Sequence, residues 1–249
     1  MNKEYKSYDD NLVIGRNSVS ELLSSGREVE RILVESGNRT GSINVILAKA
    51  KQRKIPIKEV NKSKLDSLCA NSNHQGIAAY ASEVKYCSVD DILNYAKEKD
   101  EAPFIIICDQ IEDPHNLGAI IRTAECVGAH GVIIPARHSC GVNFAVAKAA
   151  CGAIEYMKIA RVTNLVSTIK ELKEKNIWVY AADMDGVNAQ NQDFKGAVAL
   201  VVGSEGNGVS RLVKENCDVI VKLEMKGKIT SLNASVAAGV LMYEILKSR

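Results

Sequence analysis

The stretch VALVVGSEGNG, residues 198–208, decides the fold of this chain. Its first five residues form an apolar run short enough for a buried strand. The next six place three glycines around one carboxylate, Glu205, so backbone amides are left uncovered. The pattern repeats, because an apolar run at 219–223 leads to SLN at 231–233 and then to a helix of small residues. Ligands of open α/β sheets bind where strands end, and we therefore expect a cofactor pocket here.

From Pro103 onward the chain alternates apolar runs with helical patterns, which is typical of parallel strands joined by helical crossovers. We expect buried strands at 104–108, 131–134, 156–159, 178–182, 198–202 and 219–223, with helices at 117–127, 143–150, 165–175 and 234–246. A smaller α/β alternation occupies residues 1–85, and the charged amphipathic pattern within 86–102 predicts a linker helix. The sequence thus indicates an α/β protein with a small first domain, a linker, and a second domain at 103–249.

Composition narrows the class of protein. The chain has 249 residues, of which 46% are apolar and 25% charged, as in globular proteins. No run approaches 18 apolar residues and the first residues lack the apolar core of a signal peptide, so we expect no membrane span and a cytoplasmic location. The seven cysteines form no CxxC pair and the four histidines lack ligand spacing. We therefore expect no metal site and buried, reduced thiols.

Charge is unevenly distributed, although the net value is only +2. Residues 1–87 hold 14 Lys and Arg against 10 Asp and Glu, whereas the remainder holds 18 against 20. Between residues 49 and 64, seven basic side chains face only Glu59. This run is either a solvated helix face or a surface that contacts phosphates.

Polar residues follow the predicted strand at 104–108. The sequence DQIEDPHNLG at 109–118 leads into a helix that carries Arg122. One interpretation is a capped helix with Asn116 as its N-cap. In the other, Asn116 and Arg122 face one crevice, where the guanidinium binds a phosphate or a developing oxyanion.

The other two strand ends admit similar alternatives. The loop at 203–208 is neither a Walker A nor a GxGxxG motif, so its bare amides suit an adenosine group better than a dinucleotide. Ser231 or Asn233 is either a helix N-cap or a group that positions a substrate hydroxyl. The small residues that follow allow close approach of the sheet or of a partner helix across a dimer axis.

Together these stretches resemble the three motifs of the SpoU/TrmH family of RNA ribose 2′-O-methyltransferases. Asn116, Gly118 and Arg122 match the first motif, N-x-G-x-x-x-R. Residues 203–208 match G-x-E-G-x-G, and residues 231–233 with the small-residue helix match the third motif. The resemblance spans about residues 103–249.

Residues 1–85 are similar to the L30e-like substrate-binding module that precedes the catalytic domain in the rRNA branch of the family. The matching sequences are GRNSV at 15–19 and HQG at 74–76, which are less specific than the three motifs.

The resemblance implies a SPOUT domain with a mostly parallel sheet, helices on both faces and a C-terminal trefoil knot. It also implies S-adenosylmethionine as cofactor, RNA as substrate and a homodimer in which Arg122 or Asn116 acts on the partner's pocket. The expected catalytic residues are Arg122, Asn116, Glu205, Ser231 and Asn233; the expected cofactor-binding residues are Gly203, Gly208, Leu223, Met225 and Leu232; the expected RNA-binding residues are Arg16, Lys51, Arg53, Lys54 and Lys62.

The implied reaction is attack of a ribose 2′-hydroxyl on the sulfonium methyl. A guanidinium with a pKa above about 12 does not act readily as a base. We expect Arg122 to hold the nucleotide phosphate and stabilise the developing alkoxide, while the phosphate, or Glu205 through Arg122, accepts the proton.

The resemblance favours a 23S rRNA guanosine as the target, with tRNA or another rRNA site as the alternative. A non-catalytic RNA-binding module is a rival, although all five expected catalytic side chains are present. A nucleotide-dependent oxidoreductase is a second rival, but residues 109–118 lack its phosphate-binding fingerprint.

Overall fold

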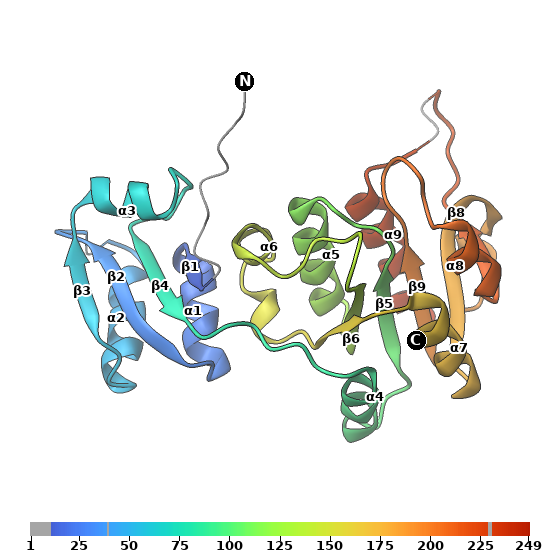
Figure 1. Cartoon of the computed structure of the whole chain (residues 1–249), viewed down its shortest axis with the longest axis horizontal. Helices are drawn as coiled ribbons and strands as arrows, with labels where there is room; N and C mark the ends of the chain where they lie inside the picture. Colours follow the sequence, from blue (N-terminus) through green and yellow to red (C-terminus); the bar gives the residue numbers. More distant parts are fainter. Residues whose placement is uncertain (1–10, 39, 229–230) are drawn as a thin grey trace. The chain divides into compact units, whose positions relative to one another are not determined.

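The computed structural model of the chain describes residues 11–38, 40–228 and 231–249. Its internal contacts divide the chain into two compact units, each of which combines two segments of sequence (Figure 1). The N-terminal unit comprises Met1–Val84 and Val142–Tyr156, and the C-terminal unit comprises Lys85–Gly141 and Met157–Arg249.

The N-terminal unit is built on a mixed sheet. Its elements are β1 (Leu12–Ile14), α1 (Arg16–Ser25), β2 (Val29–Glu35), α2 (Ile43–Gln52), β3 (Ile57–Val60), α3 (Lys62–Leu68), β4 (Ile77–Ala81), α6 (Phe144–Ala149) and the short 3₁₀ helix η1 (Ala153–Glu155). In the described part of this unit the strand order is β1-β4-β2-β3. Only the β2–β3 pair is parallel, whereas β4 runs antiparallel to β1 and β2.

Alternation along the strands gives this sheet two apolar faces. Val13, Ile32 and Val34 point toward α1 and α2, whose buried residues complete one hydrophobic cluster. On the opposite face, Leu12, Ile14 and Leu33 contact Leu65 of α3 and Phe144 of α6. Because Phe144 is only 3% exposed, α6 is part of the hydrophobic core of the N-terminal unit.

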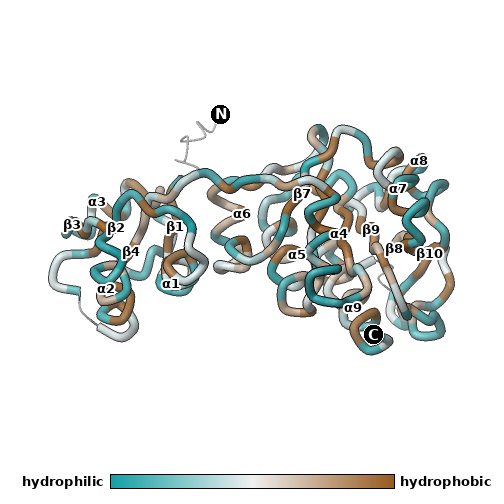
Figure 2. Tube along the Cα trace, turned by 90° about the horizontal axis from the view of Figure 1, so that it is seen from below, coloured by the Kyte–Doolittle hydropathy of each residue, from teal (hydrophilic) through white to brown (hydrophobic). Residues whose placement is uncertain are grey.

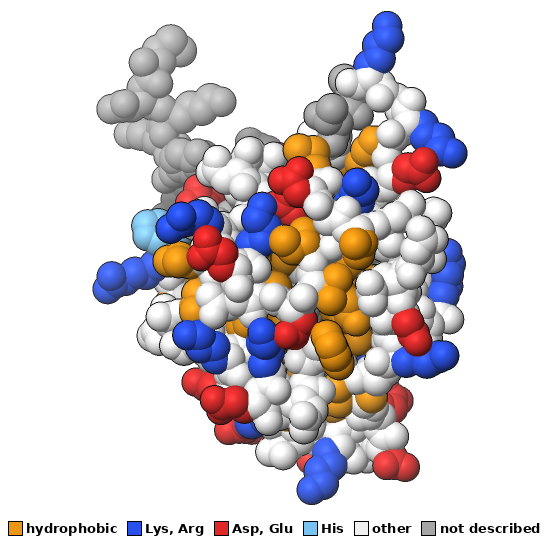
Figure 3. All heavy atoms as spheres, turned by 90° about the vertical axis from the view of Figure 1, so that its right-hand side faces the viewer, with side chains coloured by type: hydrophobic (Ala, Val, Ile, Leu, Met, Phe, Trp, Pro, Cys, Tyr) orange, Lys and Arg blue, Asp and Glu red, His pale blue; other side chains and the backbone are white. Residues whose placement is uncertain are grey.

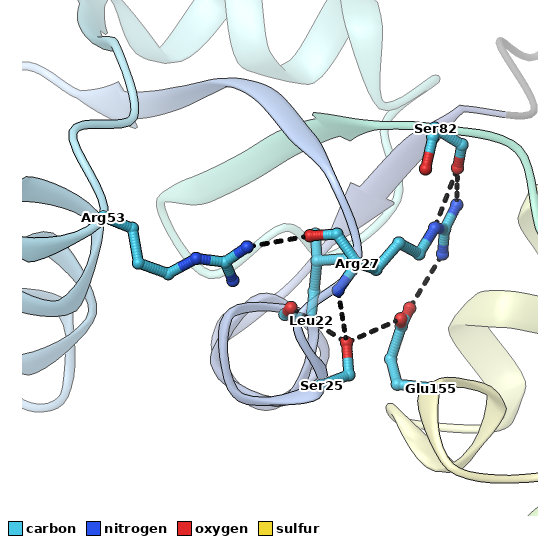
Figure 4. A network of polar contacts seen from close by, with 6 residues as sticks. All are labelled: Leu22, Ser25, Arg27, Arg53, Ser82 and Glu155. Atoms are coloured by element: carbon cyan, nitrogen blue, oxygen red, sulfur yellow. Dashed lines mark hydrogen bonds and ion pairs between the residues drawn. The ribbon is translucent and has the colours of Figure 1, made fainter.

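A polar network also holds the segment Val142–Tyr156 in the N-terminal unit (Figure 4). Arg27 donates through Nη1 to Oε1 of Glu155 at 2.8 Å and through Nε to the carbonyl of Ser82 at 2.8 Å. Ser25 Oγ donates to the second oxygen of Glu155 at 3.2 Å. The sequence predicted a helix at 143–150 and placed it in the domain at 103–249, but its contacts lie with the N-terminal unit.

The C-terminal unit contains one parallel sheet. Its elements are α4 (Val89–Glu98), β5 (Phe104–Cys108), α5 (Pro114–Cys126), β6 (Gly131–Pro135), β7 (Ile159–Val162), α7 (Leu165–Glu174), β8 (Trp178–Asn188), η2 (Ala189–Asn191), β9 (Val198–Val202), α8 (Arg211–Asn216), β10 (Val219–Lys222) and α9 (Ala234–Lys247). Within the described residues the strand order is β10-β8-β9-β5-β6-β7, and each neighbouring pair is parallel. This confirms the α/β fold with a mostly parallel sheet.

Helices cover both faces of this sheet. Ile105 and Ile107 of β5 belong to a cluster that also contains buried residues of α4, α7 and α8. Phe104, Ile106 and Cys108 alternate with these two residues along β5, so they point to the other face of the sheet, where they are fully buried. On that face α5 packs against β6 and α9 packs against β9. The central strand β9 is accordingly hydrophobic along its length (Figure 2).

Several element boundaries differ from those expected. The strand predicted at 156–159 lies at Ile159–Val162. Helix α5 begins at Pro114, because the Asp113 side chain accepts from the His115 amide and acts as N-cap, so Asn116 is inside the helix. Strand β1 and helix α8 were not predicted, since three and six residues show too little periodicity.

The expectations from composition concerned buried thiols, membrane spans and metal sites. None of the seven cysteines, all of which lie in the described residues, forms a disulfide. Cys69 and Cys108 are buried and three others are partly buried, but Cys126 and Cys151 are exposed, so the prediction of buried thiols is wrong for these two. Among the described residues, no helix is long and apolar enough to span a membrane, and no group of His, Cys, Asp or Glu is placed to hold a metal ion. The trefoil knot stays a prediction.

Candidate active site

The loop at residues 203–208, between β9 and α8, closes on itself through its backbone. The Ser204 amide donates to the carbonyl of Gly208 at 3.1 Å, and the Gly208 amide donates to the carbonyl of Ser204 at 2.9 Å. A Cβ on Gly203 would overlap the backbone of Gly208, and Gly208 itself has a φ of 64°. Glycine at both positions is therefore needed for this closed loop.

This loop forms one wall of a cavity of about 620 Å³. The other walls are formed by the middle of β8, by the end of β10 with the residues that follow it, and by α9 with the residues before it. All five residues predicted to bind the cofactor line the cavity, and so do two of those predicted to be catalytic. These are Gly203, Gly208, Leu223, Met225 and Leu232, with Glu205 and Ser231.

Three side chains from distant parts of the sequence meet at the edge of this cavity, and we call them the amide–carboxylate cluster. Asn116 of α5 donates through Nδ2 to Oε1 of Glu205 at 3.0 Å. Asn233 donates through Nδ2 to Oδ1 of Asn116 at 3.0 Å and also contacts Oε1 of Glu205. Two amides therefore orient one oxygen of the carboxylate.

Asn233 has a second role, and the interpretation of this residue as a helix N-cap is confirmed. It is the N-cap of α9, and its Oδ1 accepts from the amides of Ser235 at 3.0 Å and Val236 at 3.3 Å. The cap fixes the side chain, so that Nδ2 points to Glu205.

A second cavity, of about 240 Å³, lies on the other side of Glu205. It is lined by the loop that follows β5, by Asn116 and by parts of the 203–208 loop. Glu205 lines both cavities, together with Ser204, Asn207 and Ala234. The amide–carboxylate cluster thus stands where the two cavities adjoin.

Asp109, at the end of β5, anchors the segment behind the 203–208 loop. It is 3% exposed, and its Oδ2 accepts from the Ser210 amide at 2.7 Å. Burial raises the pKa of the neighbouring Cys108 thiol to about 12, and the charge of Asp109 adds to this effect. The thiol is therefore neutral at neutral pH, which argues against thiolate chemistry at this strand end.

Arg122 does not share the position of Asn116. It is exposed and is not among the residues that line either cavity. Six residues span about 1.7 helical turns, so the two side chains leave α5 about 120° apart. The expectation that both face one crevice is not met within a single chain.

The residue after Arg122 belongs to an exposed surface of α5 and α9. Thr123, Val236, Gly239, Val240 and Tyr243 line a shallow depression there, with Ser235 and Glu244. Val236 and Tyr243 are each 50% exposed and Val240 is 40% exposed. Their i, i+4, i+7 spacing forms one apolar stripe along α9, which we call the α9 stripe.

The residues predicted to bind RNA lie in the N-terminal unit, and two of them make bonds within the fold. Arg53 donates to the carbonyls of Leu23 at 2.7 Å and Arg27 at 3.0 Å. Arg16 donates through Nε to the carbonyl of Gln75 at 3.0 Å. Lys51, Lys54 and Lys62 are exposed.

Not every face of the molecule carries a cluster of basic side chains. On the face of the C-terminal unit shown in Figure 3, Lys and Arg alternate with Asp and Glu around a band of hydrophobic side chains. That face is not a continuous positive surface of the kind that attracts phosphates.

Sequence reasoning missed the wall that β8 contributes to the larger cavity, where Ala182, Asp183 and Met184 lie. A weak signal was present, because Asp183 and Met184 directly follow the apolar run predicted at 178–182, but no glycine-rich loop comes after that run to mark it. Gln110 and Glu112 of the smaller cavity were quoted in the sequence without a role.

Comparison with protein families gives two matches that divide the chain. Residues 103–243 match the SpoU rRNA Methylase family, and residues 12–87 match the domain described as RNA 2′-O ribose methyltransferase substrate binding. The chain is 46% identical over 244 residues to YacO of Bacillus subtilis, named as a TrmH family tRNA/rRNA methyltransferase, with 98% of each chain covered. It is 44% identical over 242 residues to a Staphylococcus aureus protein named for the same family, with 97% of each covered.

Solved structures agree with the fold. The SpoU methyltransferase AviRb of Streptomyces viridochromogenes, in complex with the cofactor AdoMet, superposes with a TM-score of 0.78 at 22% identity, covering 95% of this chain and 89% of that one. A TrmH/SpoU tRNA modifying enzyme of A. aeolicus covers 64% of this chain and 84% of its own, with a TM-score of 0.55 at 27% identity.

Proposed function

Since the chain belongs to the SpoU/TrmH family of RNA methyltransferases, we propose that it methylates the 2′-hydroxyl of a guanosine ribose in 23S rRNA, with S-adenosylmethionine as cofactor. The observation that carries this proposal is the amide–carboxylate cluster, in which Asn116 and Asn233 orient Glu205 between two adjoining cavities. A group-transfer enzyme needs such a pair of sites with one polar cluster between them.

The larger cavity fits S-adenosylmethionine in size and lining. Sites for small ligands typically measure about 300–1,000 Å³, and this one has about 620 Å³. Gly203 would offer main-chain groups to the adenosine part, Gly208 would let the loop approach it closely, and Leu223, Met225 and Leu232 would pack against it. When bound, the cofactor supplies a methyl group activated by the sulfonium charge.

The smaller cavity would hold the acceptor ribose beside Glu205. Two amides occupy Oε1 of this carboxylate, so its second oxygen is oriented to accept a hydrogen bond from the 2′-hydroxyl and then its proton. Ser231, which lines the larger cavity, would help to position the hydroxyl. In this scheme the protein holds the proton on a carboxylate and does not require a guanidinium base.

A second copy of the chain would bring Arg122 to this site. The α9 stripe exposes Val236, Val240 and Tyr243, and such a contiguous apolar surface is typical of a subunit interface. Arg122 precedes Thr123, which lines the same surface. In a homodimer built on this face, Arg122 would hold the nucleotide phosphate of the partner's substrate and stabilise the developing alkoxide.

The N-terminal unit would bind the RNA around the target nucleotide. Its match to a substrate-binding domain and its exposed Lys51, Lys54 and Lys62 support this role, since lysines supply sequence-independent contacts to phosphates. Arg16 and Arg53 contribute to the same surface mainly by fixing its backbone. A complete N-terminal unit favours rRNA over tRNA, and an RNA substrate implies a cytoplasmic enzyme.

The test is transfer of labelled methyl from S-adenosylmethionine to unmethylated 23S rRNA and, separately, to bulk tRNA, followed by mapping of ribose methyl groups. We expect label at one guanosine of 23S rRNA and its loss in Arg122→Ala. Label in tRNA alone would keep the reaction and overturn the proposed substrate. Bound cofactor without label in either RNA would favour a non-catalytic RNA-binding protein.

A further inference from the structure

The larger cavity contains a carboxylate that belongs to none of the three sequence motifs. Asp183 lies within β8, and it lines the cavity with its neighbours Ala182 and Met184. A Cβ on Gly208 would lie 3.6 Å from Oδ2 of Asp183. The carboxylate therefore borders the 203–208 loop from the side of β8, and its side chain is 15% exposed.

Lys214 and the backbone hold this carboxylate in place. Lys214 of α8 donates through Nζ to Oδ2 of Asp183 at 2.9 Å. The Asp185 amide donates to Oδ1 at 3.2 Å. Burial by itself would raise the pKa of Asp183, but the hydrogen bonds from Lys214 and the backbone, together with the charge of Lys214, lower it below its usual value. The group is ionised at neutral pH.

An ionised carboxylate has acceptor capacity beyond these two bonds. It offers about four lone-pair positions and no donor, and Lys214 and Asp185 supply one donor to each oxygen. The proposed cofactor carries matching donors, which are two ribose hydroxyls and an α-ammonium group. The charged residues that line the cavity are Asp183, Glu205, Glu224 and Lys222, so the wall has an acidic excess that suits a cationic ligand.

Resting on the proposed function, we infer that Asp183 accepts a hydrogen bond from a ribose hydroxyl or from the α-ammonium group of bound S-adenosylmethionine. Lys214 acts through Asp183 as a positioning residue, because it fixes the carboxylate against the loop. The contact is with a part of the cofactor that does not react. Loss of Asp183 therefore weakens cofactor binding.

A purely structural role makes a different prediction. If the pair only ties α8 to β8, removal of either partner loosens the 203–208 loop to the same extent. Asp183→Asn and Lys214→Met would then weaken cofactor binding equally and lower the unfolding temperature equally. If Asp183 contacts the cofactor, Asp183→Asn has the larger effect on binding, although Lys214→Met removes the same ion pair.

The experiment is calorimetric titration of the full chain with S-adenosylmethionine, S-adenosylhomocysteine and 5′-methylthioadenosine. Asp185→Asn is the matched control, since Asp185 lies two residues away on β8, is exposed and does not line the cavity. We expect Asp183→Asn to raise the Kd for S-adenosylmethionine about tenfold, Lys214→Met about threefold and Asp185→Asn less than twofold.

The three ligands identify the donor. A tenfold loss that persists with 5′-methylthioadenosine, which lacks the amino acid part, assigns the contact to the ribose, and a loss confined to the other two assigns it to the ammonium group. A Kd for Asp183→Asn within twofold of the wild type would overturn the inference, and so would equal losses in Asp183→Asn and Lys214→Met. A wild-type chain that binds none of the three ligands would overturn the proposed cofactor itself.

Discussion

The two units of the molecule use their polar side chains differently. In the C-terminal unit, Asn116, Asn233 and Glu205 bond to one another at the edge of a cavity. In the N-terminal unit, Arg53 and Arg27 bond to backbone carbonyls, and Arg27 also pairs with a buried carboxylate. The cluster side chains are held by one another beside a cavity, whereas these two arginines bond to the backbone of their own unit.

We expect the largest effect from Asn233→Asp, a substitution within the amide–carboxylate cluster. Aspartate keeps the oxygen that caps α9 but replaces the amide that contacts Glu205 with a repelling carboxylate. We expect methyl transfer to fall about 100- to 1,000-fold, as for loss of an oriented catalytic group, with unchanged thermal stability. Asn233→Ala is the control, because it also removes the cap and costs about 1 kcal/mol of unfolding free energy. Unimpaired transfer by Asn233→Asp would count against the cluster.

Arg27→Met tests the opposite role in the N-terminal unit. The side chains of Arg27 and Glu155 are 13% and 3% exposed, so removal of one partner leaves a buried charge unpaired. We expect a loss of about 3 kcal/mol in unfolding free energy, with faster hydrogen exchange at residues 142–156. Arg31→Met is the matched control, since its pair with Glu30 is exposed and such pairs contribute about 0–1 kcal/mol. Equal losses in both variants would show that the buried network is unimportant.

Arg53 and Lys51 lie in the same basic run, and substitution of each one distinguishes a contribution to fold stability from a contact with RNA. Arg53→Ala removes two bonds to carbonyls and should cost about 1–2 kcal/mol of stability. Lys51→Ala should leave stability unchanged, weaken RNA binding and reduce the slope of log affinity against log salt by about one. Urea unfolding and binding titrations at several salt concentrations check both variants. A loss of stability in Lys51→Ala together with a loss of RNA binding in Arg53→Ala would mean that the exposure of a basic side chain does not identify the phosphate contacts.

We expect the smallest effect from a substitution of His130, which lies in the C-terminal unit. This ring is fully buried, with Nδ1 accepting from the Phe104 amide at 2.9 Å and Nε2 contacting Glu101 at 3.0 Å. Burial lowers the pKa of His130 below its ordinary 6.5, although Glu101 opposes the shift. The unfolded chain therefore binds more protons, so stability is complete above pH 6.5 and declines as the pH falls toward the lowered pKa.

Thermal unfolding between pH 7.5 and 5 measures this dependence. We expect His130→Asn, which keeps an acceptor for the Phe104 amide, to flatten part of the slope. Exposed His115 provides the control, and His115→Asn should leave the slope as in the wild type. Parallel slopes for all three proteins would contradict the assignment to His130.

How much the sequence predicts also differs between the units. The cluster joins residues separated by 89 and 117 positions, yet it was predictable, because parallel strands bring their ends to one edge and each end carried an unusual polar sequence. The bond between Arg27 and Glu155 spans 128 positions and was not predictable. Neither residue stands in a pattern, and only the folded chain shows that the segment after β6 completes the core of the N-terminal unit.

The same reasoning explains two residues whose contacts the sequence did not reveal. Arg53 stood in a run of basic side chains, and charge alone does not distinguish a guanidinium that binds carbonyls from one that faces solvent. Asp183 was overlooked because a carboxylate after an apolar run is common, and its place in the cavity depends on the neighbouring strands and on Lys214 of α8. A polar residue that follows a predicted strand therefore indicates a site only where the loop after the strand also has an unusual sequence.

The most direct test of the central claim is single-turnover methyl transfer by Glu205→Gln at saturating cofactor, with cofactor affinity measured in parallel. Glutamine preserves the shape and the acceptor for Asn116 and Asn233 but cannot take a proton. Glu215→Gln, an exposed change on α8, serves as the control. We predict a rate at least about 100-fold below that of the wild type and a cofactor Kd within twofold. A Glu205→Gln enzyme that retains half of the wild-type rate would contradict the assignment of methyl transfer to this cluster.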